Sequence, residues 1–204
     1  MSYKDGPAYY YRFSRLYEMH FSLPPFSTWV EKNHESLLAC LPEKLSGDVL
    51  DIGGGIGRLS RALARRYPGQ QVLSIDTSAA MTERARTDAP LENLRFETQS
   101  FWDVDGQFDL VVCAGCWEFF QLQPSAMRLV QLLKPGGTAV VNTLGPAVFG
   151  RVRESVFRQV FRTDVWLHRP QSLTEELEVR GCRVRWNPVN LLEGSYTLVA
   201  RRSD

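Results

Sequence analysis

The sequence lacks several features that would place it in a specialised class of protein. Four cysteines in 204 residues are too few for the disulfide framework of a small secreted protein. No uninterrupted apolar run approaches the ~20 residues that cross a bilayer as a helix. The polar start, Met1 to Asp5, does not resemble a signal peptide. We therefore expect a cytoplasmic protein without a membrane partner.

The sequence also has little net charge and no recognisable metal-binding pattern. The 24 basic and 23 acidic residues leave a net charge of +1, which gives no electrostatic reason to expect nucleic acid as a partner. The three histidines, His20, His34 and His168, have no spacing typical of a metal site or a catalytic triad. Cys113 and Cys116 form a C-x-x-C pair, but no second Cys or His pair follows at zinc spacing. We expect no metal site, and apolar packing of both cysteines.

What the sequence does contain, from about residue 47 onward, is an alternation of short apolar runs and amphipathic stretches. This alternation predicts a parallel sheet with helices on both faces. We expect strands at 48–52, 71–75, 94–98, 108–113 and 138–143, and helices at 58–67, 78–86, 125–133 and 173–180. The last two apolar runs, 182–189 and 196–201, are joined by a turn too short for a crossover, so they must pair antiparallel. The fold class is therefore α/β, with a mostly parallel seven-stranded sheet that ends in an antiparallel hairpin.

Two stretches lie outside this alternation. We interpret residues 1–45 as an N-terminal helical cap or lid and residues 46–204 as the main domain, with a helical insert at about 145–170. In α/β enzymes such additions often cover the carboxyl edge of the sheet, where ligands bind. The insert carries several arginines, which indicate either a solvated helix face or a contact for an acidic acceptor.

A glycine-rich segment, Val49-Leu50-Asp51-Ile52-Gly53-Gly54-Gly55-Ile56-Gly57, follows the first expected strand and opens a helix. Glycine allows a tight turn and lets backbone N–H groups approach a ligand at the positive end of the helix. The dinucleotide-binding spacing G-x-G-x-x-G is not matched, because Arg58 stands where the third glycine belongs. Asp51 precedes the glycines, where its carboxylate suits an ammonium group better than a pyrophosphate.

A second acidic residue, Asp76, closes the second expected strand, 76 − 57 = 19 residues beyond Gly57. An acid at this place can accept hydrogen bonds from two ribose hydroxyls. The ligand that satisfies the glycines and both acids is an amino acid joined to a nucleoside without phosphates.

These segments resemble the motifs of class I S-adenosylmethionine-dependent methyltransferases. The glycine segment is similar to their first motif, 74–81 to their second, 108–113 to their fourth strand, and 132–137 to the turn before strand five. The resemblance covers about residues 45–202 and is to the small-molecule type, similar to the ubiquinone and menaquinone biosynthesis methyltransferases. It implies a Rossmann-like fold, with S-adenosylmethionine as cofactor and S-adenosylhomocysteine as product.

The resemblance departs from that family at one place. The family usually has an Asp after strand three, which reads the adenine amino group. This chain has Ser100 at that point, next to Gln99, and Asp103 lies further along. The adenine contact would therefore come from Ser100 or Gln99.

The spacing and the resemblance together define a predicted cofactor site. Its residues are Asp51, Gly53, Gly55, Gly57, Asp76, Thr77, Met81, Gln99, Ser100, Phe101, Cys113, Trp117, Tyr11 and Tyr17. Several of them have a structural alternative: Gly53 and Gly57 could serve helix–strand packing, Asp76 could cap a helix, Trp117 could belong to the apolar core, and the two tyrosines could pack their own helix.

Two residues are candidates for acid–base catalysis. Glu118 is the one ionisable residue directly after the fourth strand, where it could orient or deprotonate a nucleophile. His168, in the insert, is the second candidate. A salt-bridged Glu118 is the structural alternative, and a base is dispensable for some nucleophiles.

The function that the sequence predicts is methyl transfer from S-adenosylmethionine to an O, N or C nucleophile of a small-molecule acceptor, by in-line displacement. We expect a monomer or homodimer. An NAD-dependent oxidoreductase and a non-catalytic binding module of the same fold are the alternatives.

Overall fold

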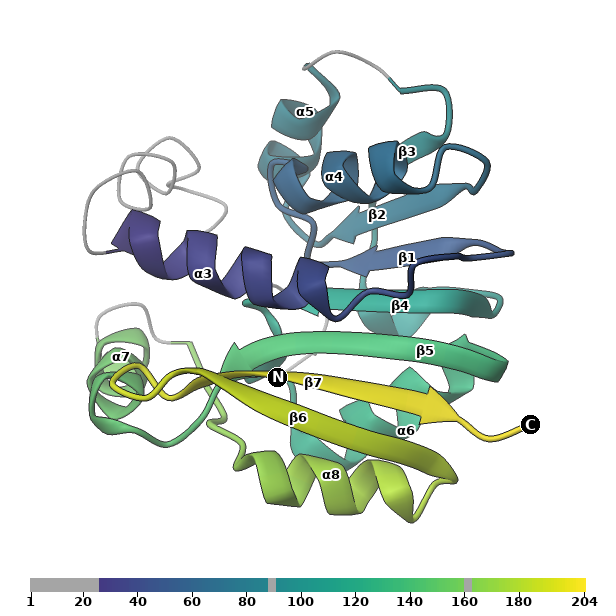
Figure 1. The fold of residues 1–204 in the computed structure, drawn as a ribbon. Coiled ribbons are helices and arrows are strands. Elements are labelled where there is room, and N and C mark those ends of the chain that lie inside the picture. The colour runs from purple at the N-terminus through teal and green to yellow at the C-terminus, as the bar shows by residue number, and fades with distance from the viewer. Residues whose placement is uncertain (1–25, 88–90, 160–162) are drawn as a thin grey trace.

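The computed structural model describes residues 26–87, 91–159 and 163–204, and its centre is a seven-stranded sheet with the order β3-β2-β1-β4-β5-β7-β6 (Figure 1). The strands are β1 (Val49–Ile52), β2 (Val72–Asp76), β3 (Leu94–Thr98), β4 (Phe108–Ala114), β5 (Leu133–Leu144), β6 (Cys182–Asn190) and β7 (Ser195–Arg202). The first five strands pair in parallel, whereas β7 pairs antiparallel with both β5 and β6. The predicted Rossmann-like sheet with its closing antiparallel hairpin is confirmed.

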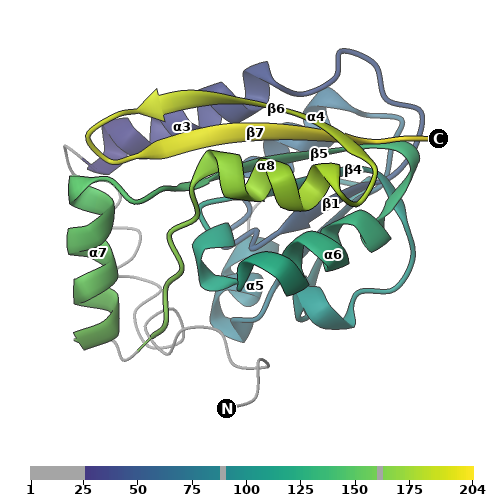
Figure 2. The same cartoon turned by 90° about the horizontal axis from the view of Figure 1, so that it is seen from below.

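Helices cover both faces of this sheet (Figures 1 and 2). The helices are α3 (Phe26–Ala39), α4 (Arg58–Arg66), α5 (Ala79–Arg86), α6 (Leu122–Leu132), α7 (Val148–Gln159) and α8 (Pro170–Glu178), with short 3₁₀ turns η1 (Phe101–Asp103) and η2 (Trp117–Phe119). Helices α3 and α4 share one apolar core with the sheet, and α6 and α8 share another. In the described ranges no helix is long and apolar enough to cross a membrane.

The central strand β4 shows why the chain folds into these two layers. Leu110 and Val112 are buried in the core beneath α3 and α4, whereas Val111 and Cys113 are buried in the opposite core. Successive side chains of a strand point to opposite faces, so a strand covered on both sides must be apolar throughout. Burial on both faces therefore explains the uninterrupted apolar run from which the sequence predicts a central strand.

Strand β5 begins earlier than the sequence indicates. We expected a turn at 134–137 and a strand from residue 138, but the pairing with β4 begins at Leu133. Phe108 lies opposite Leu133 and Leu110 lies opposite Thr138, so the intervening residues of β5 form a bulge. Gly136 has a φ of 71° within this bulge. The Lys-Pro-Gly-Gly sequence therefore bends a strand that has already started.

Helix α3 packs against one face of the sheet. Its Leu37 is fully buried in the same core as Val140 of β5 and Val199 of β7. Residues 1–25 lie outside the described residues, so the cap that we expected over 1–45 can be compared with the structure in its second half alone, and the division into cap and domain stays a prediction. Helix α7 lies within the expected insert and stands beyond the carboxyl edge of the sheet (Figure 1).

Candidate active site

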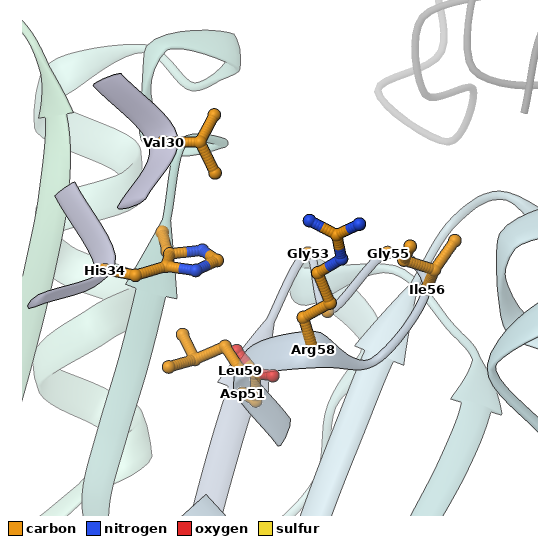
Figure 3. Close-up of a pocket in the computed structure, with 10 residues that line it drawn as sticks. Val30, His34, Asp51, Gly53, Gly55, Ile56, Arg58 and Leu59 are labelled. Carbon is orange, nitrogen blue, oxygen red and sulfur yellow. The ribbon is translucent and has the colours of Figure 1, made fainter. Parts of the chain in front are cut away.

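A pocket lies at the carboxyl ends of β1 and β4, between α3 and α4 (Figure 3). Figure 3 shows the side chains of His34 and Arg58 facing the same space from these two helices, with Asp51 beneath them. The pocket is lined by Val30, His34, Asp51, Gly53, Gly54, Gly55, Ile56, Arg58, Leu59 and Ala114. It therefore coincides with the glycine segment that the sequence singles out.

The glycine loop forms one wall of this pocket. Gly53 and Gly55 have φ values of 70° and 54°, a region that side-chain-bearing residues rarely adopt. The backbone N–H groups of Gly53 and Gly54 donate to the Ile75 carbonyl, which fixes the loop against β2. A Cβ on Gly54 would lie 2.0 Å from the Ser74 hydroxyl, whereas a Cβ on Gly55 would meet nothing within 4 Å. The loop is thus closely packed on its β2 side and open at Gly55.

Gly57 has a different place from the other glycines. It does not line the pocket but precedes α4 with a φ of 82°. A Cβ there would lie 2.7 Å from the Phe96 ring. The geometry matches the alternative of helix–strand packing, and a direct contact between Gly57 and a cofactor stays a prediction.

Asp51 forms the floor of the pocket and is only 1% exposed. The Ser60 hydroxyl donates a 2.6 Å hydrogen bond to its Oδ2. Burial raises the pKa of Asp51 to about 7, because the low-dielectric surroundings disfavour the charged form more than the Ser60 hydrogen bond supports it. A buried carboxyl group of this kind is stabilised in its ionised form by a cation placed beside it.

Asp76 ends β2 on the other side of the glycine loop. Its Oδ2 accepts from Gly55 N at 3.0 Å and its Oδ1 accepts from Ser78 N at 2.8 Å. Burial raises its pKa, with these two backbone hydrogen bonds acting in the opposite direction. Each carboxylate oxygen has a second lone pair, so Asp76 can still accept from two hydroxyl groups. Thr77 follows, half-buried, between Asp76 and the Ser78 that caps α5.

Four other predicted cofactor residues are buried in the protein. Trp117 packs in an aromatic cluster with Phe101, Trp102 and Phe120, with ring-centroid distances of 5.0 to 6.0 Å from Phe101. The exposed fractions are 1% for Met81, 2% for Phe101, and 0% for Cys113 and Trp117. Core packing, the alternative that we gave for Trp117, accounts for its position. Cofactor contacts by these four residues stay predictions.

The predicted adenine-reading residues already have local partners. Ser100 is half-buried and its hydroxyl accepts from Trp102 N at 3.3 Å, capping η1. Gln99 donates through Nε2 to the Asp103 carbonyl at 2.9 Å. The Ser100 hydroxyl keeps its proton free to donate, so Ser100 stays the better candidate for a base contact. Tyr11 and Tyr17 lie outside the described residues.

Neither catalytic candidate lines the pocket. Glu118 is 1% exposed and accepts from Thr143 Oγ1 at 3.2 Å and from Arg153 Nη2 at 3.4 Å. His168 is buried, with its Nε2 2.8 Å from the Phe120 carbonyl, and burial lowers its pKa. Glu118 thus connects the loop after β4 to β5 and α7, and His168 connects the same loop to the residues before α8. The salt-bridged alternative describes the environment of Glu118, and proton transfer by either residue stays a prediction.

A protein-family model described as a methyltransferase domain matches residues 28–185, more than half of the chain. The chain belongs to this methyltransferase family. Within the described residues of the chain, no group of three or more His, Cys, Asp or Glu side chains could hold a metal ion.

Curated relatives of the chain share part of its sequence. A trans-aconitate 2-methyltransferase of Deinococcus radiodurans is 37% identical over 107 residues, which are 52% of this chain and 41% of the relative. A malonyl-[acyl-carrier protein] O-methyltransferase of Magnetococcus marinus is 38% identical over 117 residues, which are 53% and 42% of the two chains. The chain thus spans about half the length of the curated relatives it matches.

Solved structures share the fold of this chain. The magnesium protoporphyrin IX methyltransferase of Synechocystis, solved with bound SAH, has a TM-score of 0.73 at 18% identity, and the match covers 97% of each chain. A Haloferax volcanii methyltransferase, solved with the Trm112 activator, has a TM-score of 0.76 at 18% identity over 100% of this chain and 98% of the other. At these identities the likeness shows a shared fold.

Sequence reasoning missed the two basic side chains of the pocket, His34 and Arg58. His34 comes from α3, and its pKa is lowered by burial and by the nearby Arg58 charge. Arg58 interrupts the dinucleotide-binding motif. Its place in the first turn of α4 could have indicated that it faces the ligand. Nothing in the sequence places His34 opposite the glycine loop, because that depends on how α3 packs on the sheet.

The structure also reveals a buried polar network that joins α3 to α7. Asn33 Nδ2 of α3 donates to Glu193 Oε2 at 3.4 Å, in the turn between β6 and β7. Arg153 of α7 lies 4.0 Å from Glu193 Oε1 and 3.4 Å from Glu118 Oε1. Asn142 of β5 donates to Asn33 Oδ1 at 3.4 Å. Two buried carboxylates thus share one arginine between the pocket wall and the α7 insert.

Proposed function

We propose that the pocket binds S-adenosylmethionine and that the protein transfers its methyl group to a nucleophile of a small-molecule acceptor. The observation that carries this proposal is the placement of two acidic residues on either side of one glycine loop. Asp51 lies beneath the loop and Asp76 beside it, at the ends of neighbouring strands. This set fits a ligand with a cationic amino group and a ribose.

The residues fit the parts of this cofactor one by one. Asp76 has two lone pairs left for the ribose hydroxyls. Asp51 would hold the ammonium group of the methionine moiety, whose charge compensates the cost of ionising a buried carboxyl. Arg58 supplies positive charge for the carboxylate of the same moiety, and both Arg58 and His34 supply hydrogen-bond donors for it.

The cofactor, when bound, supplies a sulfonium methyl group that is intrinsically reactive toward nucleophiles. The work of the protein is to hold and align, and alignment of two reactants can contribute about 7–11 kcal/mol to lowering the barrier. The floor at Asp51 and the walls at His34 and Leu59 enclose the cofactor site. Glu118 and His168 brace the loop after β4, next to the space for the acceptor.

We further propose that the acceptor carries a carboxylate. Relatives are named for trans-aconitate and for O-methylation of a malonyl group. Arg151 is exposed on α7, at the edge of the sheet where the pocket opens, and could bind a second acidic group of such an acceptor. A carboxylate is ionised at neutral pH and needs no general base, which agrees with the engagement of Glu118 by Arg153.

A thermal-shift comparison tests the identity of the cofactor. We expect S-adenosylhomocysteine to raise the melting temperature and NAD to leave it unchanged. Stabilisation by NAD without stabilisation by S-adenosylhomocysteine would contradict the proposal and favour an oxidoreductase.

A mass-spectrometric assay tests the acceptor. With methyl-labelled S-adenosylmethionine, we expect trans-aconitate or a malonyl thioester to gain one methyl group, and an amine that is neutral at pH 7, such as an aromatic amine, to gain none. Methylation of the amine alone would overturn the carboxylate proposal and leave the cofactor assignment intact.

A further inference from the structure

A second groove lies on the α3 face of the sheet, near the amino end of β5. Figure 1 shows the amino end of β5 and the carboxyl end of β7 extending beyond the end of α3. The uncovered part of the sheet forms a groove of about 410 Å³ against the residues that follow α3. It shares no lining residue with the cofactor pocket. Its lining residues are Ala39, Cys40, Leu41, Pro42, Thr138, Arg183, Val184, Arg185, Val199 and Arg201.

Strand register gathers three arginines on the floor of this groove. Arg201 of β7 lies directly between Thr138 of β5 and Arg183 of β6. Arg185 follows Arg183 by two residues, so it points to the same face one row further along. The groove thus has a row with one hydroxyl and two guanidinium groups, and a third guanidinium group beside that row.

These three arginines have no compensating charge. Among the described residues that line the groove none is acidic, and none of the three arginines forms an ion pair or side-chain hydrogen bond within the described part of the chain. Like charges directly opposite each other on neighbouring strands destabilise a sheet. The arrangement therefore has a cost in the free protein, and an anion bound between the guanidinium groups would remove it.

A simpler explanation exists for part of this pattern. β6 is the edge strand of the sheet, and charged side chains on an edge strand discourage pairing with another chain. That explanation covers Arg183 and Arg185, but not Arg201, because β7 is paired on both sides. It also does not explain why the charges converge on a groove with an apolar wall at Leu41 and Pro42.

We propose that this arginine groove is a binding site for a compact polyvalent anion, a diphosphate group being the best match. Guanidinium groups bind phosphate oxygens through paired hydrogen bonds, and three of them match an anion that carries about three charges. The Thr138 hydroxyl adds one further hydrogen bond. The apolar wall leaves room for the organic part of a phosphorylated ligand. The proposal does not depend on methyl transfer, because the groove lies away from the cofactor pocket.

The test is calorimetric titration of the whole protein with inorganic pyrophosphate, with the cofactor pocket saturated by S-adenosylhomocysteine and ionic strength held constant. We expect saturable binding at one site per chain. Arg201→Ala is expected to weaken this binding by about tenfold or more, and Arg201→Lys by less, since lysine keeps the charge but loses the paired hydrogen bonds. Arg65→Ala is the matched control, because Arg65 is an exposed arginine of α4 that forms no ion pair within the described residues, and it should leave binding unchanged.

Four results would overturn the proposal. The first is the absence of saturable binding at millimolar pyrophosphate. The second is an equal loss of binding in Arg65→Ala, which would show general attraction to basic surface. The third is self-association of Arg183→Ala without any change in pyrophosphate binding, which would leave edge protection as the role of the arginines. The fourth is binding of a labelled single-stranded oligonucleotide that depends on these arginines, without saturable binding of pyrophosphate. That result would identify nucleic acid, rather than a small anion, as the ligand of the groove.

Discussion

At the scale of single residues, the pocket is governed by the cost of burying carboxyl groups. Asp51 is almost fully enclosed, and its pKa is raised to about 7 by desolvation. In the ligand-free protein the folded state binds the Asp51 proton more tightly than the unfolded state does. The free energy of unfolding therefore loses a contribution from Asp51 as the pH rises from about 4 to about 7. A cation bound in the pocket favours the ionised form of Asp51 and so lowers its pKa again.

Ligand binding should consequently release a proton from Asp51. We expect the affinity for S-adenosylhomocysteine to rise from about pH 6 to about pH 8, because the ammonium group favours the ionised carboxylate. Calorimetry in two buffers with different ionisation enthalpies measures the proton released at pH 6.5. In Asp51→Asn the release should disappear; a wild-type affinity that stays flat over this range would contradict the role given to Asp51.

Asp76 gives a prediction about affinity rather than about pH. Asp76→Ala removes the acceptors for the ribose hydroxyls and the hydrogen bond to Gly55 N, so binding of S-adenosylhomocysteine should weaken about tenfold or more. The chain should stay folded, as circular dichroism would show. Asp103→Ala is the control, since Asp103 is an exposed acid that follows β3. An unchanged affinity in Asp76→Ala would mean that the ribose lies elsewhere.

At the scale of whole elements, α3 is held in place by the far end of the chain. Asn33 and Glu193 are 160 residues apart, yet their hydrogen bond joins the pocket wall to the β6–β7 turn. Arg153 then connects that turn to α7 and to Glu118. The positions of α3 and α7 are therefore coupled through the Glu193 carboxylate.

This coupling predicts a clear difference between two glutamates. Glu193→Ala leaves the Asn33 amide without its acceptor, so the free energy of unfolding should fall by about 1–3 kcal/mol. Glu193→Gln, which keeps a carbonyl acceptor for Asn33, should recover part of the loss. Glu176→Ala removes an i,i+4 ion pair with Arg180 and should cost less than about 1 kcal/mol. Urea unfolding measures all three, and equal effects for Glu193→Ala and Glu176→Ala would refute the coupling.

At the scale of the whole molecule, the sheet could be predicted from the sequence, whereas the pocket could be predicted only in part. Strands buried on both faces leave an apolar run that is easily seen, as at Leu110 to Cys113. The glycine loop and its two acids are also local, because Asp51 and Asp76 stand at strand ends. His34 and Glu193 could not be found in this way, since their neighbours come from distant parts of the chain.

The same distinction explains the residues whose place differs from expectation. Trp117 and Glu118 follow β4, where residues often face a ligand, but η2 turns both of them inward. Whether a side chain after a strand points to the cleft or to the core depends on that short turn. Its backbone geometry is not encoded in a periodic pattern, so the sequence left both possibilities open.

The most direct test of the central claim is a calorimetric titration of the wild-type protein with S-adenosylhomocysteine near neutral pH. The account predicts saturable binding at one site per chain, abolished or strongly weakened when Asp51 and Asp76 are both replaced by alanine. The absence of binding at millimolar ligand, in a protein that circular dichroism shows to be folded, would contradict it.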